Sequence, residues 1–255
     1  WDTVLEVLRK KVKEGVEVRL MYDGTCSISL LPYEYPKQLR EYGIQCKEFG
    51  PIVPILSTSQ NNRDHRKICV VDGKVAFTGG VNLADEYINK KVRFGHWKDT
   101  AIKIEGDAVQ SFTMMFLQMW NISVKEPEDY SRYMQNTTVI DRGMRNGGYV
   151  IPYGDSPYDD EEVGEKVYLD ILNRSQDYVH IMTPYLIIER RNDQCTDLCS
   201  AERGGGQADP PHIPDNENNA YMLARTYYAE LIRNGGGNLR IHAGIRSCQG
   251  LYLRR

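Results

Sequence analysis

Helix-type and strand-type patterns alternate along the first half of the chain, and this alternation leaves few folds open. Apolar residues recur at helical spacing over 4–12 before Gly15, and residues 16–22 alternate apolar and polar side chains as a strand does. A short helix over 37–42, stopped by Gly43, and a second strand over 44–49 repeat this order. A chain that alternates helices and strands predicts an α/β fold.

The next region predicts a hairpin, a further strand and a helix. The dipeptide Asp72-Gly73 separates two short apolar runs, 68–71 and 75–78, and it is typical of a tight hairpin turn. Residues 101–104 have the pattern of another strand. Residues 108–120 predict an amphipathic helix rich in Met and Phe, whose apolar stripe we interpret as core.

A polar stretch over 125–148 indicates a domain boundary, because it holds Pro127 and a cluster of glycines. Beyond it we expect a helix over 161–172, a strand over 178–183 and a helix over 220–232. Both halves run from a helix to a strand to a Pro-containing loop. We therefore predict two repeated units, 1–140 and 141–255.

Charge and residue spacing bear on the class of partner. The formal net charge of −3 gives no basic character, so a nucleic-acid partner is not expected. The six cysteines show no metal-ligand spacing, and we expect no metal and no cofactor. No apolar run approaches the roughly 20 residues that span a bilayer, and no signal peptide is visible. The chain opens at Trp1 inside a predicted helix, which we interpret as the start of an excised fragment.

The chemistry-bearing stretch has the spacing H-x-K-x-x-x-x-D, followed by G-G-x-N. On a strand, His65 and Lys67 would leave the same face and could present an imidazole and an ammonium to one phosphate. Asp72 lies at the hairpin turn, and Asn82 can donate a hydrogen bond to a phosphoryl oxygen. Taken singly, each has an ordinary structural interpretation, as a polar strand residue or a turn residue. The joint spacing is far more restrictive.

This pattern resembles the HKD motif of the phospholipase D superfamily. The similarity extends through VEVRLMYDG, RDHRKICVVDG, VAFTGGVNLADEYIN and RFGHWKDTA to bacterial cardiolipin synthases, and YGDSPYDDE, IMTPYLII and YMLARTYYAELI resemble their second half. The resemblance implies a phospholipase D-like fold of two repeated units, each a mixed β-sheet flanked by helices. It also implies phosphatidyl transfer between two phosphatidylglycerol molecules through a phosphohistidine, at the membrane of a bacterial cell.

The resemblance also implies a role for each matching residue. His65 is expected to be the nucleophile, Lys67 and Asn82 to hold the phosphate, and Asp72 to maintain the geometry of the motif. The same match assigns to Asp99 the orientation of the catalytic imidazole. The glycines that precede Asn82, which would let the backbone approach closely, are Gly79 and Gly80.

Two other functions stay open. One is a phospholipase D or nuclease of the same superfamily, which would use water or another acceptor. The other is a catalytically dead domain that binds phosphate groups through Lys67 and Asn82. For phosphatidyl transfer, the leading function, the expected partners are phosphatidylglycerol and anionic membrane lipid. The catalytic domain is then expected on the cytoplasmic side, with its anchors outside this fragment.

The second HKD motif is absent from the place where the resemblance puts it. His242 is followed by Gly244 where a lysine is needed, and no aspartate follows. DNA encoding residues 238–251 can be written so that a shifted frame reads IYEYTPGFVHAKV, which resembles the family around its second histidine. We therefore hypothesise that 190–211 and 238–255 are frameshifted translations, and we expect both stretches to form loops.

Overall fold

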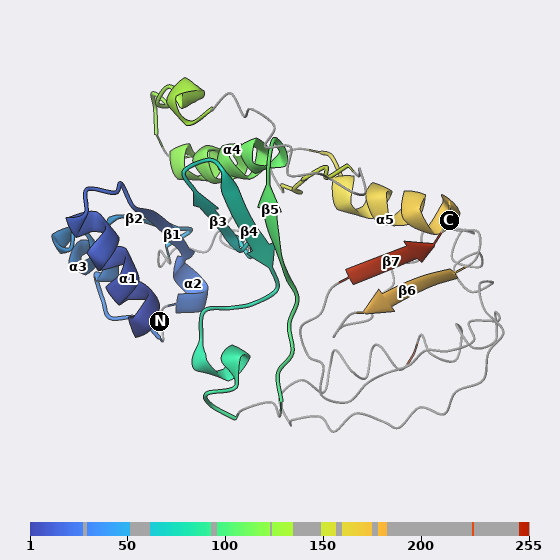
Figure 1. Cartoon of the computed structure of the whole chain (residues 1–255), viewed down its shortest axis with the longest axis horizontal. Coiled ribbons are helices and arrows are strands. Elements are labelled where there is room, and N and C mark those ends of the chain that lie inside the picture. Colours follow the sequence, from blue (N-terminus) through green and yellow to red (C-terminus); the bar gives the residue numbers. More distant parts are fainter. Residues whose placement is uncertain are drawn as a thin grey trace. The chain divides into compact units, whose positions relative to one another are not determined.

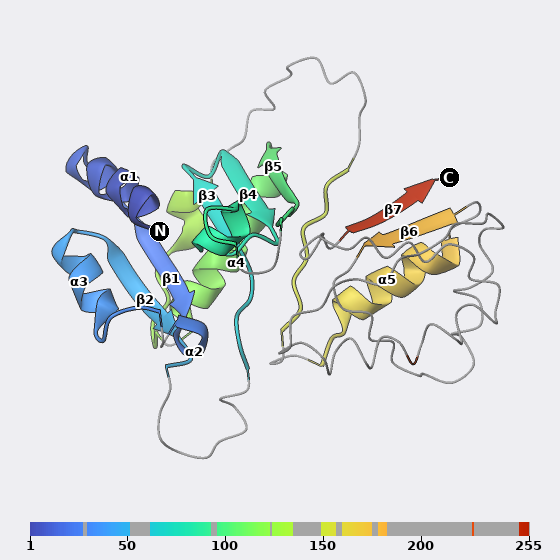
Figure 2. The same cartoon turned by 90° about the horizontal axis from the view of Figure 1, so that it is seen from below.

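The structure is a computed structural model, and it describes residues 1–27, 30–51, 62–92, 96–122, 124–134, 149–156, 160–174, 178–182, 226 and 250–254 (Figures 1 and 2). It is a mixed α/β fold, as the alternating patterns predicted. Its internal contacts divide the chain into two compact units. Unit 1 comprises Trp1–Thr78, Lys103–Pro152 and Pro157–Asp159, and unit 2 comprises Gly79–Ile102, Tyr153–Ser156 and Asp160–Arg255.

Unit 1 begins with a helix that covers a pair of parallel strands (Figure 1). The elements in chain order are α1 (Asp2–Lys13), β1 (Arg19–Asp23), α2 (Gly24–Ser27), α3 (Tyr35–Glu41) and β2 (Gln45–Phe49). The strands pair in register from Arg19 with Gln45 to Asp23 with Phe49. Parallel neighbours need a crossover, which α2 and α3 provide.

The core of this layer is apolar and buried. Leu39 and Ile44 are fully buried, and Leu5, Leu8 and Val12 of α1 pack against them. The helical spacing over 4–12 predicted α1 correctly, although Val4 and Val7 of that pattern are exposed and Leu5, Leu8 and Val12 are partly buried. The strand expected over 16–22 starts later, at Arg19, because the N–H of residue 16 still bonds to a carbonyl of the helix, 3.0 Å away.

The predicted hairpin is confirmed. Strands β3 (Ile68–Val71) and β4 (Val75–Gly79) are antiparallel, and β5 (Ala101–Glu105) completes a sheet of order β3-β4-β5. Helix α4 (Ala108–Asn121) packs on this sheet, where its Val109 and Phe112 form a core with Ala76 and Ile104. A short 3₁₀ helix, η3 (Tyr130–Tyr133), follows α4.

Unit 2 contains the 3₁₀ helix η2 (Asp85–Ile88), helix α5 (Val163–Arg174) and strands β6 (Tyr178–Met182) and β7 (Gly250–Arg254). The two strands pair antiparallel, from Tyr178 with Arg254 to Met182 with Gly250, and Figures 1 and 2 both show α5 beside them. The predicted helix over 161–172 and strand over 178–183 are confirmed within a few residues.

One expectation about the end of the chain is wrong. We predicted a loop throughout 238–255, but residues Gly250–Arg254 form strand β7. Leu251 and Leu253 alternate there with Tyr252 and Arg254 in the period-2 pattern of a strand. The stretch 190–211 and most of the helix expected over 220–232 lie outside the described residues, as does His242. The division at residue 140 and the repetition of the two units stay predictions. In the described ranges, no helix is both long and apolar enough to cross a membrane.

Candidate active site

The segment that carries the predicted nucleophile is not a strand. Strand β3 begins at Ile68, and residues 62–67 have no regular secondary structure. The expectation that His65 and Lys67 project from one strand is therefore wrong. Backbone N–H groups of this segment donate to carboxylates and not to a neighbouring strand. The Asp64 N–H donates to the Asp23 carboxylate, and the Arg66 N–H donates to the Asp64 carboxylate, each at 3.2 Å.

Asp23, the last residue of β1, anchors this segment. Its side chain is only 6% exposed. One carboxylate oxygen accepts the Thr25 N–H at 3.0 Å, and the other accepts the Asp64 N–H. The Arg63 guanidinium lies 3.7 Å from the same carboxylate and donates to the Gly50 carbonyl at 2.7 Å. The position of the segment before His65 is thus set by the end of β1.

The imidazole of His65 and the ammonium of Lys67 lie close enough to influence each other. The Lys67 Nζ donates a hydrogen bond to the His65 carbonyl at 2.7 Å. Desolvation lowers the pKa of His65 below its ordinary value, and the positive charge of Lys67 lowers this pKa further. Asp64 and Asp23 oppose this with a smaller effect. His65 as a residue is exposed, so the imidazole is reachable from solvent and is neutral near pH 7.

Arg66, which lies between these two residues, is held by its own partner. Its Nε donates to a carboxylate oxygen of Asp64 at 2.8 Å. This pair fixes the side chain of Arg66 beside the segment, and Lys67 is the cation whose charge acts on the imidazole.

Asp72 takes a backbone role that its residue type explains. It has φ of 54°, Gly73 has φ of 64°, and the Lys74 N–H bonds to the Val71 carbonyl at 3.0 Å. Two successive left-handed residues make the turn that suits the twist of a hairpin, and aspartate tolerates this conformation better than most residues. The interpretation of Asp72 as a residue that maintains the motif's geometry is consistent with this turn.

The remaining predicted site residues belong to unit 2. A Cβ at Gly79 would lie 2.4 Å from the Thr100 carbonyl oxygen, and the Gly80 N–H donates to that oxygen at 3.1 Å. Only glycine at position 79 allows this approach. Asn82 is partly exposed, and its carbonyl accepts the Ala84 N–H at 2.9 Å.

Asp99, also in unit 2, has partners of its own. Its carboxylate accepts the indole N–H of Trp97 at 3.1 Å and the Thr100 N–H at 2.8 Å. These bonds hold the carboxylate in one orientation, and its assignment to the catalytic imidazole stays a prediction. In the part of the chain that the structure describes, no group of three or more metal-ligating side chains gathers.

Sequence reasoning missed the contribution of Asp23 and Arg63. Asp23-Gly24 has the pattern of an ordinary turn, and Arg63 is one more polar residue before the motif. Asp23 and Asp64 are 41 positions apart, so no local pattern could have joined them. Their pairing depends on β1 ending beside the chain that enters β3.

Residues 2–120 match the family described as "Cardiolipin synthase, PLD-like domain", a range that includes β1 and the His65 segment. A protein of Streptococcus mutans described as uncharacterised is 51% identical over 236 residues, which cover 92% of this chain and 50% of that protein.

Two relatives carry functional names. The cardiolipin synthase of Alkalihalophilus pseudofirmus is 33% identical over 92% of this chain and 46% of its own length. Cardiolipin synthase 2 of Staphylococcus epidermidis is 36% identical over 72% of this chain and 37% of its own length. The chain therefore spans half or less of the length of these relatives.

Proposed function

Because the chain belongs to the cardiolipin synthase family of phospholipase D-like domains, we propose that it contributes the nucleophilic half of a phosphatidyl-transfer site. The reaction joins two phosphatidylglycerol molecules and gives cardiolipin and glycerol. The observation that supports this most is the pairing of an exposed, neutral imidazole at His65 with the ammonium of Lys67.

The proposed chemistry proceeds in two displacements. A His65 nitrogen attacks the phosphorus of one phosphatidylglycerol, a nitrogen–phosphorus bond forms, and the bond to the glycerol oxygen breaks. That oxygen takes a proton from a general acid and leaves as glycerol; in this family the second HKD histidine has this role, and its motif is missing from this sequence. The hydroxyl of a second phosphatidylglycerol then attacks, gives its proton to the same group, which now acts as a base, and releases His65. Splitting one displacement into two lowers each barrier.

The electrostatics of the segment suit the first step. A lowered pKa keeps His65 unprotonated at neutral pH, and the unprotonated ring is the nucleophile. The same positive charge of Lys67 that lowers this pKa would offset the negative charge that builds on the phosphoryl oxygens. In this proposal Asn82 donates a further hydrogen bond to the phosphate, and Asp99 orients an imidazole. Gly79 and Gly80 position Asn82, and Asp72 maintains the hairpin.

A second candidate is a domain that binds the phosphate of a lipid without turnover. The sequence favours it at one point: the second H-x-K is missing, and Gly244 stands where its lysine would be. Without a general acid the glycerol oxygen leaves poorly, because an alkoxide is a poor leaving group. Phosphate binding through Lys67 and Asn82 would survive that loss. Both candidates place the domain at the cytoplasmic face of a bacterial membrane, where its lipid substrate lies.

The test uses phosphatidylglycerol labelled at its phosphate and the 255-residue chain. Acid-labile label on wild-type protein, absent from His65→Ala and retained by His96→Ala, is the result expected for transfer. His96 is the matched control because it is an exposed histidine outside the motif. Thin-layer separation then distinguishes cardiolipin from phosphatidic acid, which would indicate hydrolysis.

Two other outcomes decide between the candidates. Lipid binding that Lys67→Met weakens, with no label ever found on His65, supports the binding domain and overturns transfer by this chain. Lipid that neither binds nor labels overturns both.

A further inference from the structure

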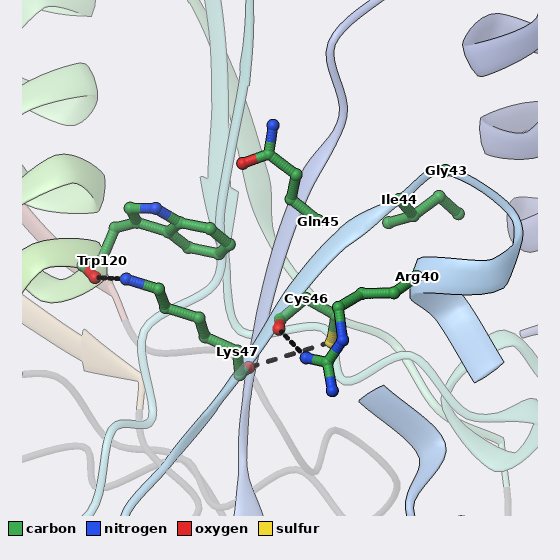
Figure 3. A pocket seen from close by; sticks show the side chains of 7 residues that line it. All are labelled: Arg40, Gly43, Ile44, Gln45, Cys46, Lys47 and Trp120. Atoms are coloured by element: carbon green, nitrogen blue, oxygen red, sulfur yellow. Dashed lines mark hydrogen bonds between the residues drawn. The ribbon is translucent and has the colours of Figure 1, made fainter. Parts of the chain in front are cut away.

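A hollow of about 390 Å³ lies in unit 1 along β2, between α3 and the end of α4 (Figure 3). This size is at the lower end of pockets that hold small ligands, and it suits a headgroup better than a whole lipid. Figure 3 shows Trp120 and Lys47 on one side and Arg40 on the other. The side chains that line it are Arg40, Ile44, Gln45, Cys46, Lys47 and Trp120.

Two cations flank this Arg40–Lys47 hollow, and each is held in place by a backbone carbonyl. An Arg40 Nη donates to the Cys46 carbonyl at 3.0 Å, and the Lys47 Nζ donates to the Trp120 carbonyl at 2.5 Å. The Lys47 ammonium also lies 4.6 Å from the centre of the Trp120 ring, a favourable cation–π distance. Both cations are therefore positioned before any ligand arrives.

Neither cation has a carboxylate partner within ion-pair distance among the residues that the structure describes. The carboxylate that acts on Lys47 is that of Glu128, which is engaged by the guanidinium of Arg19. A guanidinium has five N–H donors and an ammonium has three. Arg40 and Lys47 each use one in the bonds above, so donors remain for a ligand.

The surroundings of the hollow add positive charge. Arg9 of α1 lies over the ring of Tyr42, 4.1 Å from its centre, and Val12 of the same helix reaches Gly43 at the rim. The last turn of α1 is basic, although Lys11 pairs with Glu14. One negative charge opposes this, because Glu48 follows Lys47 on β2 and acts on the Cys46 thiol, although its carboxylate lies against Gly24.

We propose that the Arg40–Lys47 hollow binds a phosphate ester, as carried by the headgroup of an anionic phospholipid, at a site separate from His65. Arg40 contacts the phosphate through its planar fork, and Lys47 contributes a positive point charge from the opposite side of the hollow. The amide of Gln45 contacts the polar remainder of the headgroup.

The hollow can bind but has no means to react. It holds no histidine, and burial raises the pKa of its Cys46 thiol to about 11, so the thiolate is scarce at neutral pH. Its role is to hold a lipid headgroup, and the inference does not depend on phosphatidyl transfer by His65.

The test measures binding by the full chain in a His65→Ala background, so that failure of the transfer chemistry cannot affect it. Arg40→Gln and Lys47→Gln are compared in two arms: sedimentation with vesicles of phosphatidylglycerol and phosphatidylcholine, and titration with soluble glycerol 3-phosphate. Each variant is expected to weaken vesicle binding about three- to tenfold, which is the range for one charge-assisted contact. Pure phosphatidylcholine vesicles should bind weakly to all proteins.

Lys37→Gln is the matched control, because Lys37 is on the same helix as Arg40 and its ammonium is 3.7 Å from Glu34. Arg40 is exposed, so its variant should fold even if Lys47→Gln does not, and melting temperatures check this. Weakening in both arms supports the lipid headgroup, and weakening only with glycerol 3-phosphate supports a soluble phosphate ester. Unchanged binding in Arg40→Gln, or an equal loss in Lys37→Gln, overturns the site.

Discussion

The His65–Lys67 segment and the Arg40–Lys47 hollow both hold a lysine ammonium against a backbone carbonyl, at 2.7 Å and 2.5 Å respectively. Their supports differ. Lys47 belongs to a strand and leans on Trp120, which is 6% exposed, whereas Lys67 belongs to an irregular segment held by Asp23. The first arrangement gives a rigid cation on a packed core. The second places a cation beside an imidazole that solvent can reach.

This difference indicates how two lysines in similar bonds can have different roles. A lysine next to a histidine changes the protonation of that histidine, which matters for a nucleophile. A lysine next to a tryptophan and a carbonyl is held in one position, and in our proposal it attracts the phosphate of a lipid headgroup. Four substitutions test this contrast.

Replacing His65 with alanine should separate the two regions most clearly. We expect phosphohistidine formation to fall at least about 1000-fold, because the nucleophile is gone, while binding of phosphatidylglycerol vesicles at the hollow stays within about twofold. Labelling and sedimentation of the same preparation measure both. Loss of both labelling and vesicle binding would mean that the two regions form one site, and it would contradict the contrast.

Replacing Lys67 with methionine should change both the rate of phosphohistidine formation and the pKa of His65. We expect phosphohistidine formation to fall about 100-fold, through the loss of charge stabilisation. The pKa of His65 should rise, because Lys67 is one of the groups that lower it, and the acid limb of the labelling rate should move to higher pH. NMR titration of the imidazole measures the pKa. Lys74→Met, at the hairpin turn, is the control, and an unchanged His65 pKa in Lys67→Met would contradict the proposed coupling.

Replacing Glu128 with glutamine tests the ion pair that supports Trp120, one of the residues that line the hollow. Arg19 bonds to Glu128 with two nitrogens and lies 5.4 Å from the Trp120 ring centre, with its side chain 13% exposed. We expect the free energy of unfolding at pH 7 to fall by about 1–2 kcal/mol after allowance for solvent screening. Urea unfolding of both proteins measures it.

The pH dependence of this difference has a definite sign. The hydrogen bond from Arg19 lowers the pKa of Glu128 to about 2. A lowered carboxyl pKa gives stability that is complete above the unfolded value of about 4.5, and this stability is lost as the pH falls through about 2. The two proteins should therefore converge between these values. A gap that stays constant down to pH 2 would show that the ion pair is not its source.

Replacing Asp23 with asparagine should have the smallest effect. Asparagine keeps one acceptor oxygen, for either the Thr25 N–H or the Asp64 N–H, and removes the negative charge. Because that charge raises the pKa of His65, the pKa should fall in the variant, by less than Lys67→Met raises it. Asp2→Asn, on α1, is the control. A rise in the pKa would mean that Asp23 acts by positioning the segment and not by its charge.

Much of the fold could be predicted from local sequence. The spacing of apolar residues predicted α1, α4 and α5, and Asp72-Gly73 predicted the hairpin, because helix periodicity and turn chemistry depend on neighbouring residues. The same reasoning failed for residues 62–67 and for Gly250–Arg254. Both features depend on contacts between remote parts of the chain. The irregular segment donates a backbone N–H to the distant Asp23 carboxylate, and the short strand β7 pairs with the distant strand β6.

The amino-acid sequence alone determined the candidate chemistry: a histidine and a lysine two positions apart, followed by an aspartate and an asparagine at the spacing of a phosphate-binding motif. The tertiary structure decided how these groups are held. It brought Asp23 to the segment before His65, and it brought Trp120 to Lys47 across 73 positions. The physical reason is that side-chain type is a local property, whereas desolvation, charge proximity and anchoring arise only when distant segments pack together.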